Sequence, residues 1–191
     1  QSFVINEPGC NVVIDTTYSS PLCHDDNAQE LTWTVSGGVG PYTSQLTDNS
    51  SNSPWYGPNS GLSTVTLFNT LPPGMYTILA TDMSNCSAIL TMPIISPDSM
   101  IIDFTATDVE CYGNNTGSLS AIASGGTPGS GSNYTYLWSP NNQTSFNISN
   151  LIAGTYSVLV TDANSCQTTN SHTITQADQL IIDSINSTLI S

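Results

Sequence analysis

The sequence contains no lysine and no arginine. Its 191 residues carry 14 Asp and Glu residues and a formal net charge of −14 at pH 7. Nucleic acids and anionic membrane surfaces repel such a chain, because binding to either depends on basic side chains. A phosphate site would have no Arg or Lys clamp, and Schiff-base chemistry would have no side-chain amine. Nucleic-acid binding and lysine-dependent chemistry are therefore excluded.

Long apolar runs and catalytic motifs are also missing. No run approaches the roughly 20 residues that span a bilayer, so we expect no membrane insertion. The chain has only two histidines, His24 and His172, and it has neither Gly-x-Ser-x-Gly nor zinc-type spacing. We expect no enzymatic activity and no cofactor. Gln1 opens without a signal-peptide pattern, so we interpret the sequence as the mature form of a secreted, extracellular protein.

What the sequence does contain is a repeat. Residues 74–86 read GMYTILATDMSNC, and residues 154–166 read GTYSVLVTDANSC. Upstream, residues 23–38 match residues 111–126 without a gap. The repeated unit spans about 80–88 residues, and copy one carries an insertion at residues 47–64 where copy two has only a short loop.

Each copy is built from short runs that favour β-strands. β-branched and aromatic residues alternate with polar ones, turn residues follow every eight to twelve positions, and no helical period is sustained. This pattern predicts an all-β protein of two tandem immunoglobulin-like Greek-key β-sandwich modules. We place module 1 at residues 10–97 and module 2 at residues 98–179.

Both ends of the sequence repeat a single strand of the unit. Residues 2–8 resemble residues 91–97, the last strand of copy one, and residues 181–191 repeat residues 101–111, the first strand of copy two. We therefore interpret residues 1–9 and 180–191 as orphan strands that could not fold alone. We expect them to add to sheets of identical subunits in a head-to-tail polymer. The alternative is a fragment of a giant multi-repeat protein with covalently continuous modules.

The motifs resemble the SprB-type repeat of cell-surface adhesins in gliding bacteria. Copy two carries nearly the whole pattern, at Cys111, Gly125, Gly126, Tyr134, Tyr136, Trp138, Leu151, Gly154, Tyr156, Asp162 and Cys166. Copy one carries Gly37, Gly38, Pro41, Tyr42, Leu71, Gly74, Tyr76, Asp82 and Cys86, but has Leu46 in place of the tryptophan. The resemblance implies an exported structural or adhesive module, and it brings no catalytic residues with it.

The five cysteines suggest disulfide bonds in an oxidising compartment. The repeat places Cys23 and Cys86 at the positions of Cys111 and Cys166. We therefore predict that each module closes its own bond, Cys23–Cys86 and Cys111–Cys166, a thiol or metal function being the alternative. Cys10 would then be unpaired or would bond a second chain.

Two acidic positions are weak candidates for calcium. Asp82 and Asp162 end a strand before a tight turn, where an Asx turn is the simpler interpretation, because calcium needs six or more oxygen ligands. The stretch Cys23–Asp26, CHDD, contains metal-ligand types, but its counterpart in copy two reads CYGN. We expect a polar turn there and no metal.

The insertion of copy one supplies the remaining candidate site. Trp55 and Tyr56 could stack on surface glycans, or they could cover the sandwich or contact a neighbouring module. Asn-x-Ser/Thr acceptors for N-glycosylation occur at Asn49, Asn85, Asn114, Asn133, Asn142, Asn147 and Asn186.

Overall fold

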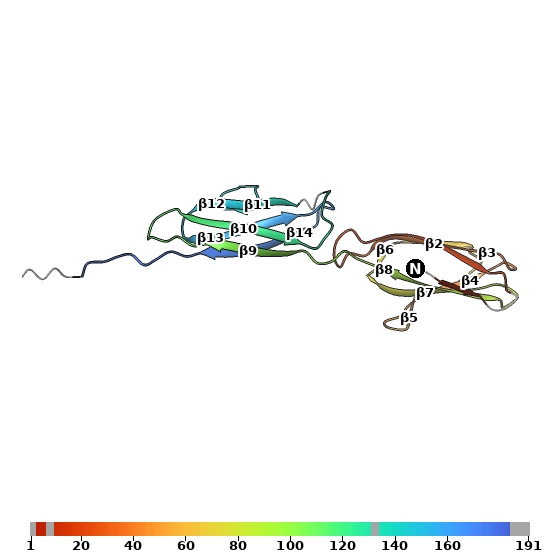
Figure 1. The fold of residues 1–191 in the computed structure, drawn as a ribbon. Helices are drawn as coiled ribbons and strands as arrows, with labels where there is room; N and C mark the ends of the chain where they lie inside the picture. Colours follow the sequence, from red (N-terminus) through yellow and green to blue (C-terminus); the bar gives the residue numbers. More distant parts are fainter. Residues whose placement is uncertain (1–2, 7–9, 131–133, 184–191) are drawn as a thin grey trace, which may run out of the picture. The chain divides into compact units, whose positions relative to one another are not determined.

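Every regular element in the described part of the protein is a β-strand, which confirms the all-β prediction. The computed structural model describes residues 3–6, 10–130 and 134–183. The chain divides into two compact units, residues 1–99 (unit 1) and residues 100–191 (unit 2) (Figure 1). Within the described ranges, no helix has the length and apolar character needed to cross a membrane.

Unit 1 is a sandwich of a five-stranded and a three-stranded sheet. The larger sheet has the order β1-β8-β7-β4-β5, and the smaller sheet has the order β2-β3-β6. Figure 1 draws β2 and β7 in opposite layers of the unit. The strands are β1 (Phe3–Asn6), β2 (Val13–Ser19), β3 (Ala28–Ser36), β4 (Thr43–Asp48), β5 (Ser53–Ser60), β6 (Thr64–Leu71), β7 (Gly74–Thr81) and β8 (Ser87–Ile94).

Unit 2 repeats this plan with two three-stranded sheets. One sheet has the order β12-β10-β9 and the other has the order β11-β13-β14. The strands are β9 (Ile101–Thr107), β10 (Gly117–Ser124), β11 (Thr135–Ser139), β12 (Asn147–Leu151), β13 (Gly154–Thr161) and β14 (Gln167–Ile174).

The strand order is that of an immunoglobulin-like Greek key. In both units the chain crosses to the other sheet after β3 or β10, returns for β6 or β12, and crosses once more before β7 or β13. A tyrosine corner accompanies this topology: the hydroxyl of Tyr76 donates to the carbonyl of Pro72 at 2.9 Å, and that of Tyr156 donates to the carbonyl of Ile152 at 3.1 Å. The predicted fold class is therefore confirmed.

The last two strands of each unit pair in the same register. The β7–β8 ladder runs from Gly74 opposite Ile94 to Thr81 opposite Ser87. The β13–β14 ladder has the same eight pairs, each shifted by 80 positions, from Gly154 opposite Ile174 to Thr161 opposite Gln167. The sequence repeat is thus a repeat of strand pairing.

The two cores are filled by different side chains at matched positions. In unit 1 the buried tryptophan is Trp33 on β3, and the facing sheet contributes Leu46 on β4. In unit 2 the repeat places Ala121 at the position of Trp33 and Trp138 at that of Leu46, and both are buried. The buried tryptophan has thus changed sheets, from β3 in unit 1 to β11 in unit 2, and each core keeps one.

The N-terminal strand differs from its prediction. β1 is not an orphan strand, because it pairs antiparallel with β8 of its own chain, from Phe3 opposite Thr91 to Asn6 opposite Ala88. The exposed backbone edge of β8 explains this, since any apolar strand within reach can pair with such an edge. At the other end, residues 177–183 leave unit 2 without forming a strand, and residues 184–191 lie outside the described ranges (Figure 1).

Candidate functional site

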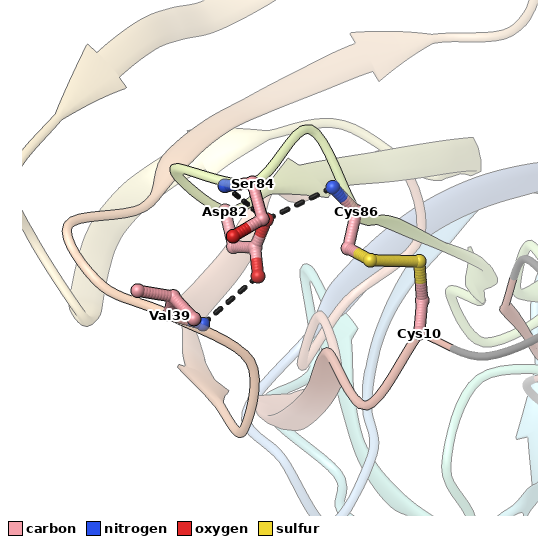
Figure 2. The surroundings of a disulfide bond; sticks show 5 residues. All are labelled: Cys10, Val39, Asp82, Ser84 and Cys86. Carbon is pink, nitrogen blue, oxygen red and sulfur yellow. Dashed lines mark hydrogen bonds between the residues drawn. A yellow bond between two sulfur atoms is a disulfide. The ribbon is translucent and has the colours of Figure 1, made fainter.

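A disulfide bond closes one end of unit 1. Cys10, just before β2, is bonded to Cys86, just before β8, with a Cα–Cα distance of 5.4 Å (Figure 2). The β1–β8 ladder brings the two cysteines together, because it runs toward Asn6 on one strand and Ala88 on the other. The prediction that Cys10 is unpaired or bonded to a second chain is therefore wrong.

The predicted Cys23–Cys86 bond does not form, because its two cysteines lie at opposite ends of unit 1. Cys86 precedes β8, whereas the ring of His24, next to Cys23, lies 3.0 Å from the carbonyl of Pro97 beyond the other end of β8. Eight residues of strand at about 3.3 Å each separate these ends by roughly 26 Å. A disulfide requires Cα atoms within about 7 Å.

The predicted Cys111–Cys166 bond fails for the same reason. Cys166 precedes β14, whereas the segment after Cys111 lies at the far end of that strand, where the backbone N–H of Gly113 donates to the side chain of Gln176 at 2.9 Å. Cys111 is an exposed free thiol. The repeat correctly equated the cysteine positions but did not show which end of the sandwich each one occupies.

Beside the disulfide, the buried carboxylate of Asp82 holds three backbone N–H groups. One oxygen accepts from Ser84 at 2.8 Å and from Cys86 at 2.9 Å, and the other accepts from Val39 at 2.8 Å (Figure 2). We call this arrangement, one aspartate bound to three N–H groups, the carboxylate clasp. It fixes the turn that presents Cys86 and joins that turn to the loop between β3 and β4.

Unit 2 contains the same carboxylate clasp. Asp162 accepts from Thr127 at 2.8 Å with one oxygen, and from Asn164 and Cys166 at 2.9 Å each with the other. A glycine precedes the loop donor in both units. A Cβ atom at Gly38 would lie 2.5 Å from Asp82 Oδ2, and one at Gly126 would lie 2.8 Å from Asp162 Oδ2. This close approach explains the second glycine of each Gly-Gly pair in the repeat.

Hydrogen bonding stabilises the ionised form of Asp82. The backbone N–H of Val39, with those of Cys86 and Ser84, lowers the pKa of the Asp82 carboxyl below its ordinary value of 3.8, and burial opposes this shift. A similar effect lowers the pKa of Asp108, mainly through the backbone N–H of Thr175. The pKa of Asp48 is lowered mainly by the backbone N–H of Ser50.

The carboxylate clasp favours the Asx-turn interpretation over calcium. All three N–H dipoles point at the oxygens that a cation would need, so a calcium ion would have to displace them. In the described part of the chain, no three His, Cys, Asp or Glu side chains gather into a metal-binding group. His24 and Asp25 form only an exposed 3.5 Å contact, and Asp26 accepts from the backbone of Cys23, as in a polar turn.

The Trp55 and Tyr56 rings of the insertion take part in internal contacts. They lie on β5, an edge strand with no counterpart in the described residues of unit 2. Tyr56 meets Trp33 edge-to-face with ring centroids 5.7 Å apart, and Trp55 meets Tyr76 edge-to-face at 6.2 Å. Tyr56 packs against the core, whereas Trp55 remains 42% exposed. Trp55 is therefore the more accessible of the two rings, and Tyr56 is half-buried.

The glycosylation acceptors that the structure describes are exposed. These are Asn49, Asn85, Asn114, Asn142 and Asn147. Asn133 and Asn186 lie outside the described ranges. The exposed positions remain predicted acceptors.

Comparison with known proteins supports the resemblance found in the repeat. The family model of the SprB repeat matches residues 104–143, which run from β9 to the loop after β11 in unit 2. A search of curated proteins finds no match.

Several solved structures are similar in fold. The three N-terminal domains of the bacteriophage RB49 Highly Immunogenic Outer Capsid protein are 18% identical, with a TM-score of 0.46, over 88% of this chain and 59% of that one. A C-terminal intimin fragment in complex with the translocated intimin receptor domain is 18% identical, with a TM-score of 0.38, over 86% and 64%. Fibronectin(III)-like modules of Clostridium thermocellum CbhA are 11% identical, with a TM-score of 0.33, over 92% and 100%. The chain thus spans less than two thirds of the first two structures.

Proposed function

We propose that this chain is a non-catalytic structural module of an extracellular adhesin or stalk at the cell surface. The observation that carries the proposal is the tandem repeat of one sandwich with the same strand register, in a chain whose second unit matches the SprB repeat. A disulfide bond in unit 1 fits an oxidising location outside the cell.

Assembly of identical subunits is the finer part of this proposal. Ile182 is 75% exposed, whereas its repeat equivalent Ile102 on β9 is 5% exposed and paired with β10. Leu180 and Ile181 are 92% and 73% exposed, and Ile101, the equivalent of Ile181, is exposed as well. A strand whose inward-facing isoleucine is buried in β9 and exposed here fits donation to a sheet edge of a neighbouring subunit. Because donor and acceptor are different surfaces, the contact is head-to-tail and gives a fibre.

Charged substitutions in the exposed strand test this assembly. In the full chain, Leu180→Asp with Ile182→Asp should reduce the assembly to monomers, because a charge on the buried face of a strand opposes docking. Light scattering and electron microscopy report the assembly state. The matched control is Ile152→Asp, an exposed apolar position of unit 2 that should leave assembly unchanged.

If the doubly substituted chain assembles like the wild type, residues 180–183 are not the donor strand and covalently continuous modules become the better explanation. Surface location is tested separately. An antibody against the chain should label intact cells of the source, and labelling only after lysis would contradict the proposed location.

A second candidate function, binding of surface glycans, has one observation in its favour. Trp55 is 42% exposed on β5, a strand that the described ranges show in unit 1 and not in unit 2. Aromatic rings stack on sugar rings, so a glycan array should show binding that Trp55→Ala abolishes. If wild-type binding is no higher than background, glycan binding is excluded and the structural function is the one that remains.

A further inference from the structure

The Cys10–Cys86 bond encloses nearly the whole body of unit 1. Its cysteines are 76 positions apart, and β2 through β7 lie between them. Only β1 and β8 lie outside the enclosed segment, residues 11–85. When the two ends of unit 1 are pulled apart, the tension can therefore pass through covalent bonds that bypass β2 through β7.

We propose that the Cys10–Cys86 disulfide is a load-bearing link that carries tension through unit 1 and leaves residues 11–85 unextended. The path runs from β1 through the disulfide to β8 and then to residue 99. The inference deepens the proposed stalk function and rests on it for its biological use. Under tension, unit 1 would then lengthen only as far as its covalent bonds allow.

The β1–β8 pair determines how tension reaches the disulfide. Because the strands are antiparallel, the start of β1 at Phe3 lies opposite Thr91 near the end of β8, and the cysteines lie beyond the other end of the ladder. A pull on residues 1 and 99 separates the four residue pairs one after another, as in opening a zip. The load then meets the disulfide at Cys86.

Beyond the disulfide, tension passes along β8 itself. β8 is an extended strand, so it has little length to give. The carboxylate clasp holds the anchor point, because Asp82 accepts the N–H of Cys86 and also binds the loop at Val39. Asp82 and Val39 lie inside the enclosed segment, so the clasp keeps the body attached without lying on the load path.

The link belongs to unit 1 alone. The repeat aligns residues 13–23 with residues 101–111, which places Asp98 at the position of Cys10. Unit 2 therefore has no cysteine at the position of Cys10. The repeat therefore shares its fold between the two units but not the Cys10–Cys86 type of bond.

Single-molecule pulling tests the proposal on the full chain, with one handle at the N-terminus and the other on an azide-bearing residue at position 99. Each fully extended residue spans about 3.3–3.6 Å, so release of residues 11–85 adds about 260 Å. The oxidised protein should show only the short opening of β1. Cys23, inside the enclosed segment, is disulfide-bonded as well, so the variants are compared in a Cys23→Ser background. In that background, Cys10→Ser with Cys86→Ser should show the step of about 260 Å, and the matched control with Cys23→Ser alone should behave as the wild type.

A step of about 260 Å in the oxidised wild type, or its absence in the doubly substituted protein, would overturn the proposal. If the substituted protein does not fold, the same wild-type tether is pulled before and after addition of a phosphine reductant, and the step should appear only afterwards. Because single molecules are measured, the result is independent of subunit assembly. It can thus fail while the stalk function stands, and the reverse.

Discussion

One aspartate organises the end of each unit. Asp82 and Asp162 each hold two N–H groups of their own turn and one of the neighbouring loop, at distances that agree within 0.1 Å between the units. The sequence located these residues and their Asx turns. It did not show the contact with Val39 or Thr127, which lies 43 or 35 positions away and depends on how the two sheets face each other.

Asp162→Asn should destabilise unit 2. The amide NH2 group cannot accept, so at least one N–H of the carboxylate clasp loses its partner. Hydrogen bonds to charged groups contribute about 1.5–3 kcal/mol, and we expect the free energy of unfolding to fall by about 2 kcal/mol. Trp138 is the only tryptophan of unit 2, so its 19F NMR signal in 5-fluorotryptophan-labelled protein follows unit 2 in urea separately from Trp33 and Trp55. The control Asp103→Asn, exposed on β9, should change stability by less than about 0.5 kcal/mol.

The pH dependence of unit 1 should carry the signature of Asp82. Its folded-state pKa lies below 3.8, so the ionised carboxylate stabilises the folded form above the unfolded-state pKa. This contribution is lost as the pH falls through the folded-state pKa. The stability difference between the wild type and Asp82→Asn should therefore be constant above about pH 5 and should shrink at lower pH. Urea unfolding at several pH values measures it, and a difference that grows in acid would contradict the assignment.

At the scale of strands, periodicity and turn residues predicted the sandwich fold correctly. They did not predict which strand pairs with the edge of β8. Alternation identified the sandwich strands because one face of each is buried. The sequence predicts that the N-terminal strand pairs with another chain, because its resemblance to β8 does not reveal that β8 has a free edge within reach. The cysteine pairs failed similarly, because equivalent positions in a repeat share an environment but do not have to share a partner.

β14 shows how an edge strand is managed without a β1. On the face that turns toward the opposite sheet, β14 has half-buried Thr168 and His172 and exposed Asn170, where β8 has the buried Ala88, Leu90 and Met92. Asn170 donates to the carbonyl of Ile102 on the opposite sheet at 2.9 Å, and the His172 ring lies 5.6 Å from that of Phe104. Polar groups turned inward make an edge a poor template for another strand.

Trp33→Ala combined with Leu46→Trp gives unit 1 the side chains that unit 2 has at these two core positions. Trp33→Ala alone leaves a cavity and should cost about 3–5 kcal/mol, and Leu46→Trp alone overpacks the core at about 1–3 kcal/mol. Together they reproduce Ala121 and Trp138, so the double variant should be more stable than the sum predicts by at least about 1 kcal/mol. Urea unfolding of all four proteins measures this coupling. Additive losses would show that the sheets do not share this volume.

The charge of the whole molecule sets how copies can meet. With 14 acidic residues and no lysine or arginine, contacts between copies cannot use Lys or Arg ion pairs. We expect assembly to survive 1 M salt. At this concentration the Debye length falls to about 3 Å, and the stronger screening weakens the repulsion between acidic surfaces. Light scattering across a salt series measures this. Dissociation by salt alone would show that charge pairing holds the copies together.

The shared register of the β7–β8 and β13–β14 hairpins bears on how such a chain can change in length. Gly74 to Ile94 and Gly154 to Ile174 pair residue for residue, 80 positions apart. Unequal recombination between the two copies at any aligned codon of these segments would join strands that already have the same partner and register. Descendant genes could thus gain or lose whole modules in one event, with no intermediate that encodes half a sandwich.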